Sequence, residues 1–406
     1  MSKLSNMSIS NNLPSSKTTF IITCFILISS ILFILNYQST STNKLLSTAS
    51  TLTFQFFSFS NPVSHDPPSS NKNTCDIFDG RWVFDDSYPI YAPGSCSYIE
   101  NEFNCFRNGR PDFGYLKYRW QPYGCDIPRF DATKMMEMLR GKRLVFVGDS
   151  LNRNMCQSLV CFLKMFQGQT FRNKLNYNYI FKDYNCSITL ITAPFLVQQR
   201  HLPKKNETLR LDTLDAMIYK YRDADFLIFN TGHWWNHNKS RNGENYFQEG
   251  DIVHKKMDVG VAYTKALKTW ANWVDNNVNT SKTKVFFRGF AHTHFMGGDW
   301  DTDGVCHNET EPITDEKLLK PYPFLMQTLE KVISEMKTPV TYLNITKLTD
   351  YRKDGHPSMY RHRGRKKPGA IQDCSHWCLP GVPDSWNELL FSSLLFSSEG
   401  FNRTTY

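Results

Sequence analysis

The feature that most constrains the fold of this chain is an alternation of short apolar runs with longer helix-like stretches. The apolar runs are LVFV, DFLIFN, KVFFRG and VTYLNI, at residues 144–147, 225–230, 284–289 and 340–345. The helix-like stretches lie at 131–141, 260–278 and 325–337. Strands that alternate with helices form parallel sheets that are covered on both faces. The sequence therefore predicts an α/β fold with a parallel sheet flanked by helices.

Polar sequence follows each apolar run. The continuations read GDSLNRN, NTGHWW, RGFAHTHF and NITK, and their polar side chains include Ser150, Asn230, His233, Arg288, His292 and His294. Ligands of open parallel sheets bind beyond the carboxyl ends of the strands, so these residues predict a site at that edge. For His292 and His294 we prefer ordinary polar packing, with metal binding or substrate contact as the alternative.

The N-terminal region contains a membrane-anchor pattern. No charged residue occurs between Lys17 and Lys44, and this window contains the run FIITCFILISSILFIL. Such a run can cross a bilayer core, and the basic residues before it favour a cytosolic N-terminus. A cleaved signal peptide is the alternative, but no A-x-A-like site follows the run. We expect a cytosolic tail at 1–17, an uncleaved transmembrane signal anchor at 18–37 and a lumenal chain beyond.

The lumenal chain divides by composition into three parts. Residues 38–74 are rich in Ser, Thr, Asn and Pro, which is typical of a flexible stem. Residues 75–130 contain four cysteines and many aromatic and turn residues, and predict a disulfide-rich N-terminal lobe. Residues 131–406 contain the alternating strands and helices and are expected to form the α/β domain. The lobe aromatics Trp82, Tyr88, Tyr91, Tyr115, Tyr118 and Trp120 either stack on sugar rings or, as we expect for most of them, fill a small core.

Cysteines and glycosylation sequons support a secretory compartment. Ten cysteines follow the anchor, at positions 75, 96, 105, 125, 156, 161, 186, 306, 374 and 378. An even number in an oxidising lumen predicts disulfides, although one or two thiols, Cys156 or Cys186, can remain free. Seven N-x-[ST] sequons lie on the lumenal side, at Asn185, Asn206, Asn238, Asn279, Asn308, Asn344 and Asn402.

The charge pattern excludes nucleic acid as the expected partner. The net charge of +9 is small for 406 residues and is mostly spread along the chain. One basic cluster stands out: Arg361, Arg363, Arg365, Lys366 and Lys367. It either attracts an anionic polymer such as pectin or forms a solvated loop.

Ser150 follows a predicted strand and is either a nucleophile or an N-cap. A serine nucleophile needs a histidine that takes its proton and an acid that orients the histidine. The C-terminal stretch QDCSHWCLPGVPDSWNELL supplies Asp373 and His376, between cysteines and before a helix that we expect from Ser385 onward. A zinc site at Cys374, His376 and Cys378 is the alternative, which an oxidising lumen disfavours.

These motifs resemble the plant trichome birefringence-like family of polysaccharide O-acetyltransferases, which has a GDSL/SGNH-hydrolase type of fold. The resemblance rests on Gly148-Asp149-Ser150, on Asp373-x-x-His376, and on the stretches CDIFDGRWV, GRPDFGYLKYRWQPYGCDIPRFD, FNTGHWW and YLNITKLTDYRKDGHPS. A GDS tripeptide alone is a weak signal, but these motifs in this order cover nearly the whole lumenal chain.

The resemblance implies a role for each matching residue. Ser150 would be the nucleophile, His376 the general base and acid, and Asp373 the acid that orients the histidine. The backbone N–H of Ser150 would bind the oxyanion. The remaining oxyanion or substrate-binding candidates are Gly148, Asp149, Arg153, Asn230 and His233. The wider hydrolase group often has a G-x-N-D block where this chain reads Asn230-Thr231-Gly232-His233, which leaves the second oxyanion donor open between Asn230 and His233.

The implied activity is acetyl transfer to a plant cell-wall polysaccharide through an acetyl-serine, in a single-pass type II Golgi membrane protein. The resemblance implies no bound cofactor or metal, but an acetyl donor is required, for which acetyl-CoA is one candidate. A polysaccharide acetylesterase with the same triad and a wall-polysaccharide binding protein are the alternatives.

Overall fold

The computed structural model describes residues 75–398, apart from 167–168, 173–175, 202–206 and 365–370. The expected cytosolic tail, signal anchor and stem, at 1–17, 18–37 and 38–74, lie outside the described residues. Among the helices that are described, none is long and apolar enough to cross a bilayer.

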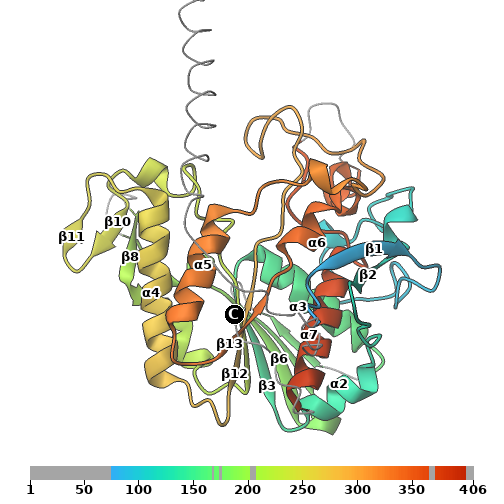
Figure 1. The fold of residues 1–406 in the computed structure, drawn as a ribbon, viewed down its shortest axis with the longest axis horizontal. Coiled ribbons are helices and arrows are strands. Elements are labelled where there is room, and N and C mark those ends of the chain that lie inside the picture. Colours follow the sequence, from blue (N-terminus) through green and yellow to red (C-terminus); the bar gives the residue numbers. More distant parts are fainter. Residues whose placement is uncertain (1–74, 167–168, 173–175, 202–206, 365–370, 399–406) are drawn as a thin grey trace, which may run out of the picture. The chain divides into compact units, whose positions relative to one another are not determined.

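A seven-stranded sheet forms the centre of the described chain (Figure 1). Its strand order is β13 (Val340–Leu343), β12 (Lys284–Arg288), β9 (Phe226–Phe229), β3 (Arg143–Gly148), β6 (Cys186–Thr192), β5 (Asn176–Phe181) and β4 (Gln169–Arg172). The four predicted apolar runs are β3, β9, β12 and β13, and each is parallel to its neighbours. The predicted α/β class and the parallel core of the sheet are confirmed.

The prediction of a wholly parallel sheet is wrong, because β5 pairs antiparallel with β6 and β4 pairs antiparallel with β5. The short connection between β5 and β6 is the reason. It consists of the 3₁₀ turn Lys182–Tyr184 and one further residue, Asn185. A parallel pair needs a crossover of a dozen or more residues, so this connection permits only an antiparallel hairpin.

Both faces of the sheet are buried, and β3 shows how the sequence achieves this. Leu144 and Phe146 belong to one core cluster, whereas Val145 and Val147 belong to the other. Successive side chains of a strand point to opposite faces, so a continuous apolar run serves both cores. Burial of each such side chain contributes about 1.5–3 kcal/mol.

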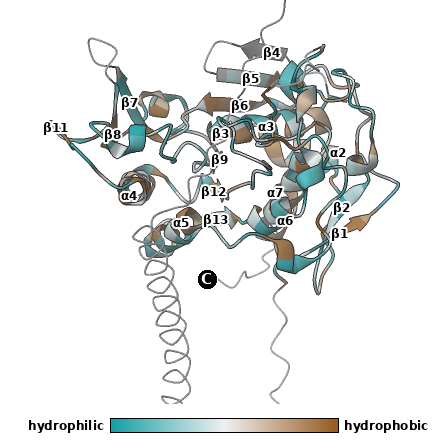
Figure 2. Ribbon diagram, turned by 90° about the horizontal axis from the view of Figure 1, so that it is seen from above, coloured by the Kyte–Doolittle hydropathy of each residue, from teal (hydrophilic) through white to brown (hydrophobic). Residues whose placement is uncertain are grey.

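Helices cover the two faces, as Figures 1 and 2 show. One core contains residues of α4 (Val259–Asn277) and α5 (Phe324–Glu335). The other contains residues of α2 (Ala132–Leu139), α3 (Ser150–Phe162), α6 (Thr346–Asp350) and α7 (Val382–Ser398). The predicted helices correspond to α2, α4 and α5, with ends within two residues. The last helix begins at Val382, three residues before the predicted start.

A second sheet was not predicted. Its order is β11 (Ile252–Val253), β10 (Phe247–Glu249), β8 (Glu207–Leu214) and β7 (Val197–His201). Short 3₁₀ turns occur at Asn101–Phe103 (η1), Gly114–Leu116 (η2), Lys182–Tyr184 (η3), Ala216–Lys220 (η5), Arg241–Gly243 (η6), Glu316–Leu318 (η7), Lys353–Gly355 (η8) and Met359–Arg361 (η9).

The segment before α2 is loop-rich, with one antiparallel ribbon of β1 (Gly80–Phe84) and β2 (Tyr118–Pro122). Trp82 and Trp120 face each other across it, with ring centroids 5.7 Å apart. Four of its six sugar-stacking candidates are buried: Tyr88, Tyr91, Tyr115 and Trp120. Tyr91 and Trp120 belong to the core that also contains residues of α6 and α7, whereas Tyr115 packs in a small cluster with Cys105 and Cys378. The Tyr88 hydroxyl donates to Glu388 of α7. Core packing thus accounts for most of these aromatic side chains, as expected.

The predicted disulfide framework is confirmed. The four bonds are Cys75–Cys125, Cys96–Cys161, Cys105–Cys378 and Cys306–Cys374. Cys156 and Cys186 are buried free thiols within the described chain, as the sequence suggested. The zinc alternative is wrong, because both of its cysteines, Cys374 and Cys378, are in disulfides.

Candidate active site

The Gly148-Asp149-Ser150 turn is fixed by Asn230 at the end of the neighbouring strand. Gly148 has a φ of +154°, and a Cβ there would lie 1.9 Å from Asn230 Oδ1. Glycine is therefore required for the close approach. The Asp149 N–H donates to Asn230 Oδ1 at 3.0 Å, and Asn230 Nδ2 donates to Asp149 Oδ1 at 2.7 Å. This reciprocal pair joins the ends of β3 and β9.

Ser150 is the first residue of α3 rather than its N-cap, so the N-cap interpretation of this serine is wrong. The N-cap is Asp149, whose side chain accepts from the Leu151 N–H at 2.9 Å. The Ser150 N–H belongs to the first helical turn, where no intrahelical acceptor is available. A helix N-terminus directs such N–H groups and the positive end of its dipole at an anion.

The structure brings Ser150, His376 and Asp373 together across 226 residues of sequence. Ser150 Oγ lies 2.7 Å from His376 Nε2, and His376 Nδ1 lies 2.8 Å from Asp373 Oδ2. The carboxylate can only accept, so Nδ1 carries the proton and Nε2 is free to accept the serine proton. This is the geometry that activates a serine nucleophile.

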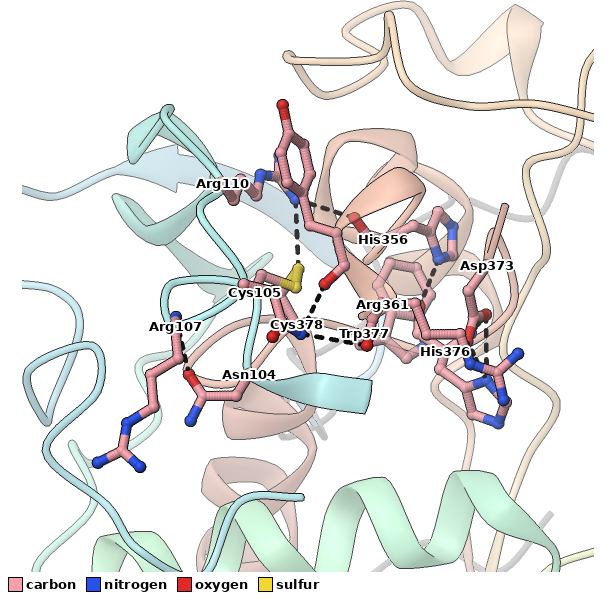
Figure 3. The surroundings of a disulfide bond; sticks show 12 residues. Asn104, Cys105, Arg107, Arg110, His356, Arg361, Asp373, His376, Trp377 and Cys378 are labelled. Atoms are coloured by element: carbon pink, nitrogen blue, oxygen red, sulfur yellow. Dashed lines mark hydrogen bonds and ion pairs between the residues drawn. A yellow bond between two sulfur atoms is a disulfide. The ribbon is translucent and has the colours of Figure 1, made fainter. Parts of the chain in front are cut away.

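Asp373 is held in its ionised form. Its side chain is nearly fully buried, which opposes ionisation. His376 and the Arg361 guanidinium outweigh burial and hold the pKa of Asp373 well below its usual range. Arg361 Nε lies 3.6 Å from Asp373 Oδ2, and Figure 3 shows its side chain beside both residues. Of the predicted basic cluster, Arg361 therefore contacts the site.

The 373–378 loop carries both His376 and Asp373, and four tethers hold it. Two are the disulfides Cys306–Cys374 and Cys105–Cys378, the second of which is drawn in Figure 3. A third is Asn154 of α3, which accepts from the Trp377 N–H at 2.8 Å and donates to the Trp377 carbonyl at 3.1 Å. The fourth is a backbone bridge between Ser358 and Asp373. Asn154 joins the loop directly to α3, which carries the serine, and the other three tethers join it to other parts of the chain.

Arg153 lies one helical turn after Ser150, and its guanidinium is paired with carboxylates. Nη1 lies 2.6 Å from Glu100 Oε2, and Nη2 pairs with Glu102. Glu102 also lies 3.4 Å from Arg361, so a chain of ion pairs runs from Arg153 to Asp373. Arg153 thus lies beside the site, and its proposed substrate contact stays a prediction.

His233 lies behind the turn. Its Nε2 lies 2.8 Å from the Ala291 carbonyl, and its Nδ1 lies 3.5 Å from Asp149 Oδ2. The fully buried Arg288 places Nη2 3.8 Å from Asp149 Oδ1. Burial opposes ionisation of Asp149, but His233, Arg288 and Asn230 outweigh it and hold the pKa of Asp149 below its usual range. These groups stabilise the turn; an oxyanion role for Asn230 or His233 stays a prediction.

His292 and His294 are both buried. They approach Asp350, with distances of 3.8 Å from His292 Nδ1 and 3.4 Å from His294 Nε2 to Asp350 Oδ1. In the part of the chain that the structure describes, no group of three or more His, Cys, Asp or Glu side chains is arranged to hold a metal ion. The contacts of His292 and His294 with Asp350 are those of polar packing.

Sequence reasoning missed Asn154, Glu102 and His356. Asn154 could have been found, because it lies four residues after Ser150 and therefore on the same face of the predicted helix as the candidate nucleophile. Glu102 and His356 have no such local signal. Their partners lie far away in sequence, so only the folded chain reveals them.

Two family models match this chain. Residues 127–393 match a model described as a GDSL/SGNH-like acyl-esterase family found in Pmr5 and Cas1p, and residues 73–126 match the PMR5 N-terminal domain. The protein trichome birefringence-like 4 of Arabidopsis thaliana is 52% identical over an alignment 372 residues long, and the match covers 85% of this chain and 81% of that protein.

The chain belongs to the trichome birefringence-like family.

Two further Arabidopsis relatives are longer than this chain. Trichome birefringence-like 1 is 54% identical over 79% of this chain, and trichome birefringence is 50% identical over 83% of it. The matches span 62% and 59% of the lengths of those proteins. The family resemblance inferred from the GDS and D-x-x-H motifs is confirmed, and the family model that matches most of the chain is described as GDSL/SGNH-like acyl-esterase.

Proposed function

We propose that this protein transfers acetyl groups to hydroxyls of a plant cell-wall polysaccharide, hemicellulose or pectin, through an acetyl-Ser150 intermediate. The observation that carries the proposal is the continuous contact from Ser150 Oγ through His376 to Asp373. Membership of the trichome birefringence-like family supports the polysaccharide acceptor.

In the first half of the proposed reaction, His376 Nε2 takes the proton of Ser150 and Oγ attacks the carbonyl carbon of the acetyl donor. The oxyanion forms near the Ser150 N–H at the start of α3. The tetrahedral intermediate then collapses. The bond between the acetyl carbon and the leaving group breaks, and His376 gives the proton to that group.

In the second half, His376 takes the proton of a sugar hydroxyl, whose oxygen attacks the acetyl-serine. Collapse breaks the bond to Oγ and returns the proton to Ser150. Asp373 stays ionised throughout and stabilises the imidazolium. The proposed oxyanion or substrate-binding set consists of Gly148 and Asp149 in the turn itself and of Arg153, Asn230 and His233 beside it. These residues act by contact or by fixing the Ser150 N–H.

The proposed setting is the Golgi membrane, in single-pass type II orientation with the catalytic domain in the lumen. The four disulfides fit an oxidising compartment. The sequon residues Asn185, Asn238, Asn279 and Asn308 are exposed, as glycosylation requires. The reaction needs an acetyl donor, for which acetyl-CoA is one candidate, and no bound cofactor.

A polysaccharide acetylesterase is the second candidate, because the matching family model is described as acyl-esterase. Water would then replace the sugar hydroxyl in the second half of the reaction, with the same three residues.

Two assays of the full-length protein and its Ser150→Ala variant test the proposal. In the first, each protein is incubated with an acetyl donor and wall oligosaccharides; in the second, with pre-acetylated oligosaccharides. Acetylated product from the native protein alone supports transfer. Loss of acetyl from the pre-acetylated glycan, without transfer, supports the esterase. If both proteins bind glycan equally and saturably and neither adds nor removes acetyl groups, both enzyme functions are contradicted and a glycan-binding function is supported.

A further inference from the structure

Two buried histidines outside the triad contact each other beside the 373–378 loop. His294 follows β12, and His356 follows η8. Their exposed fractions are 7% and 2%. His294 Nδ1 lies 2.7 Å from His356 Nε2, which is hydrogen-bond distance for two ring nitrogens.

The outer nitrogens of this pair both face carbonyl oxygens. His294 Nε2 lies 2.9 Å from the Asp350 carbonyl, and His356 Nδ1 lies 2.7 Å from the His376 carbonyl. A carbonyl oxygen can only accept, so both outer nitrogens carry protons. The contact between the inner nitrogens needs a third proton, because otherwise two lone pairs would face each other. Two neutral imidazoles carry only two ring N–H protons, so the pair has one net positive charge.

The surroundings place this charge on His294. Asp350 Oδ1 lies 3.4 Å from His294 Nε2. Burial opposes ionisation of Asp350, but its contacts with His294, His292 and Lys320 keep its pKa below the usual range. Burial, followed by the charge of His294, lowers the pKa of His356 well below its usual value. His356 is therefore the neutral acceptor and His294 the charged donor.

Other charged groups face the pair from the neighbouring elements. Lys320, before α5, and His292, on the same segment as His294, both act on the Asp350 side. Arg110, from the N-terminal segment, donates to the His356 carbonyl at 2.9 Å but is paired with Asp112. Asp373 lies in the 373–378 loop and favours a positive charge on the pair. The two carboxylates, Asp350 and Asp373, thus offset the cations around the shared proton.

The pair contacts the 373–378 loop at three points. The His294 N–H donates to the Cys374 carbonyl at 3.0 Å, and the His356 ring donates to the His376 carbonyl (Figure 3). The His356 ring also stacks on Trp377, with centroids 4.1 Å apart. The pair therefore contacts the backbone on both sides of the turn that presents His376 to Ser150.

We propose that His294 and His356 share one proton and together act as positioning residues for His376. This inference rests on the proposed function, because it concerns the same loop. Loss of the shared proton removes the hydrogen bond between the rings, frees His356 to turn and lets His376 move away from Ser150.

The test uses full-length protein with ¹⁵N-labelled histidine and measures two properties. One is the pH profile of acetyl-enzyme formation from p-nitrophenyl acetate. The other is a far-downfield proton resonance that couples to one nitrogen of each of two histidines. The variants are His294→Gln, whose amide N–H can donate to His356 without titrating, and His356→Phe, which keeps the stacked ring. His254→Gln, at a histidine paired with Glu249, is the control.

The native protein and the control should show the resonance, and their rate should fall over the pH range in which the resonance disappears. His294→Gln should lack the resonance and keep its rate there, and His356→Phe should lose about 10- to 100-fold at every pH. Absence of the resonance from the native protein, or a His294→Gln profile that superimposes on the native one, would overturn the proposal. Native protein that shows the resonance but forms no acetyl-enzyme contradicts the proposed function and still supports the shared proton.

Discussion

Substitution of Asn154 tests most directly which contacts fix the position of the 373–378 loop. Its side chain is fully buried and bonds both backbone polar groups of Trp377, the residue after His376. Asn154→Ala leaves a buried N–H and a buried carbonyl without partners. Each unsatisfied group costs about 1–3 kcal/mol, and loss of the buried amide itself offsets part of this. We expect the free energy of unfolding to fall by about 2–4 kcal/mol.

Activity should fall as well, because Trp377 is adjacent to the triad histidine. The disulfides at Cys374 and Cys378 still hold the loop at two points, so the displacement should be small and the loss about 10- to 100-fold. Urea unfolding measures the stability, with a common m-value for both proteins. Single-turnover formation of the acetyl-enzyme measures the activity.

Asn276→Ala is the matched control. Asn276 is an exposed asparagine of α4 whose amide donates to the Asn272 carbonyl, and surface changes of this kind stay within about 0.5 kcal/mol. An Asn154→Ala protein as stable and as active as this control would refute the account of the loop.

Three further predictions concern other parts of the fold. Gly148→Ala should destabilise the protein or prevent its folding, since the new Cβ would overlap Asn230 Oδ1 at 1.9 Å; soluble protein with an unchanged urea midpoint would contradict this. Removal of the Cys306–Cys374 disulfide by a double change to Ala should cost about 2–5 kcal/mol and slow acetyl-enzyme formation; equal midpoints and rates in urea and single-turnover assays would speak against the tether. Burial raises the pKa of Asp384 to about 7, above its value in the unfolded chain, so the folded protein retains the carboxyl proton to a higher pH. The free energy of unfolding should therefore fall as the pH rises from about 4 to 7. In Asp384→Asn the fall should be smaller, as urea midpoints at pH 5 and pH 8 would show, and an equal fall in both proteins would be evidence against it.

The sequence predicted those parts of the fold that depend on local patterns. Runs such as Leu144–Val147 are apolar on both faces, which identifies strands at the centre of a covered sheet. The hairpin of β5 and β6 was missed, because no apolar run marks β5 and its direction depends on a short connection. The disulfide framework was predicted but not its pairing, since Cys105 and Cys378 are 273 residues apart.

The site was predictable where motif and chemistry coincide. Ser150 needs a base and an acid, and Asp373-x-x-His376 is the segment that supplies both, so the three could be grouped before their contact was visible. Supporting residues were not predictable, because their partners are set by tertiary packing. His356 contacts the triad loop through a backbone carbonyl, which leaves no pattern in the sequence.

The central claim is that Ser150 carries the acetyl group between donor and polysaccharide. Its most direct measurement is mass spectrometry of the Ser150 peptide after a pulse of acetyl donor, followed by discharge with or without wall oligosaccharide. We predict that Ser150 becomes acetylated and that the oligosaccharide removes this acetyl group faster than water does. The Ser150→Ala and His376→Ala variants should not become acetylated at this peptide. An unlabelled Ser150 in an active protein, or a discharge rate that the oligosaccharide does not change, would contradict it.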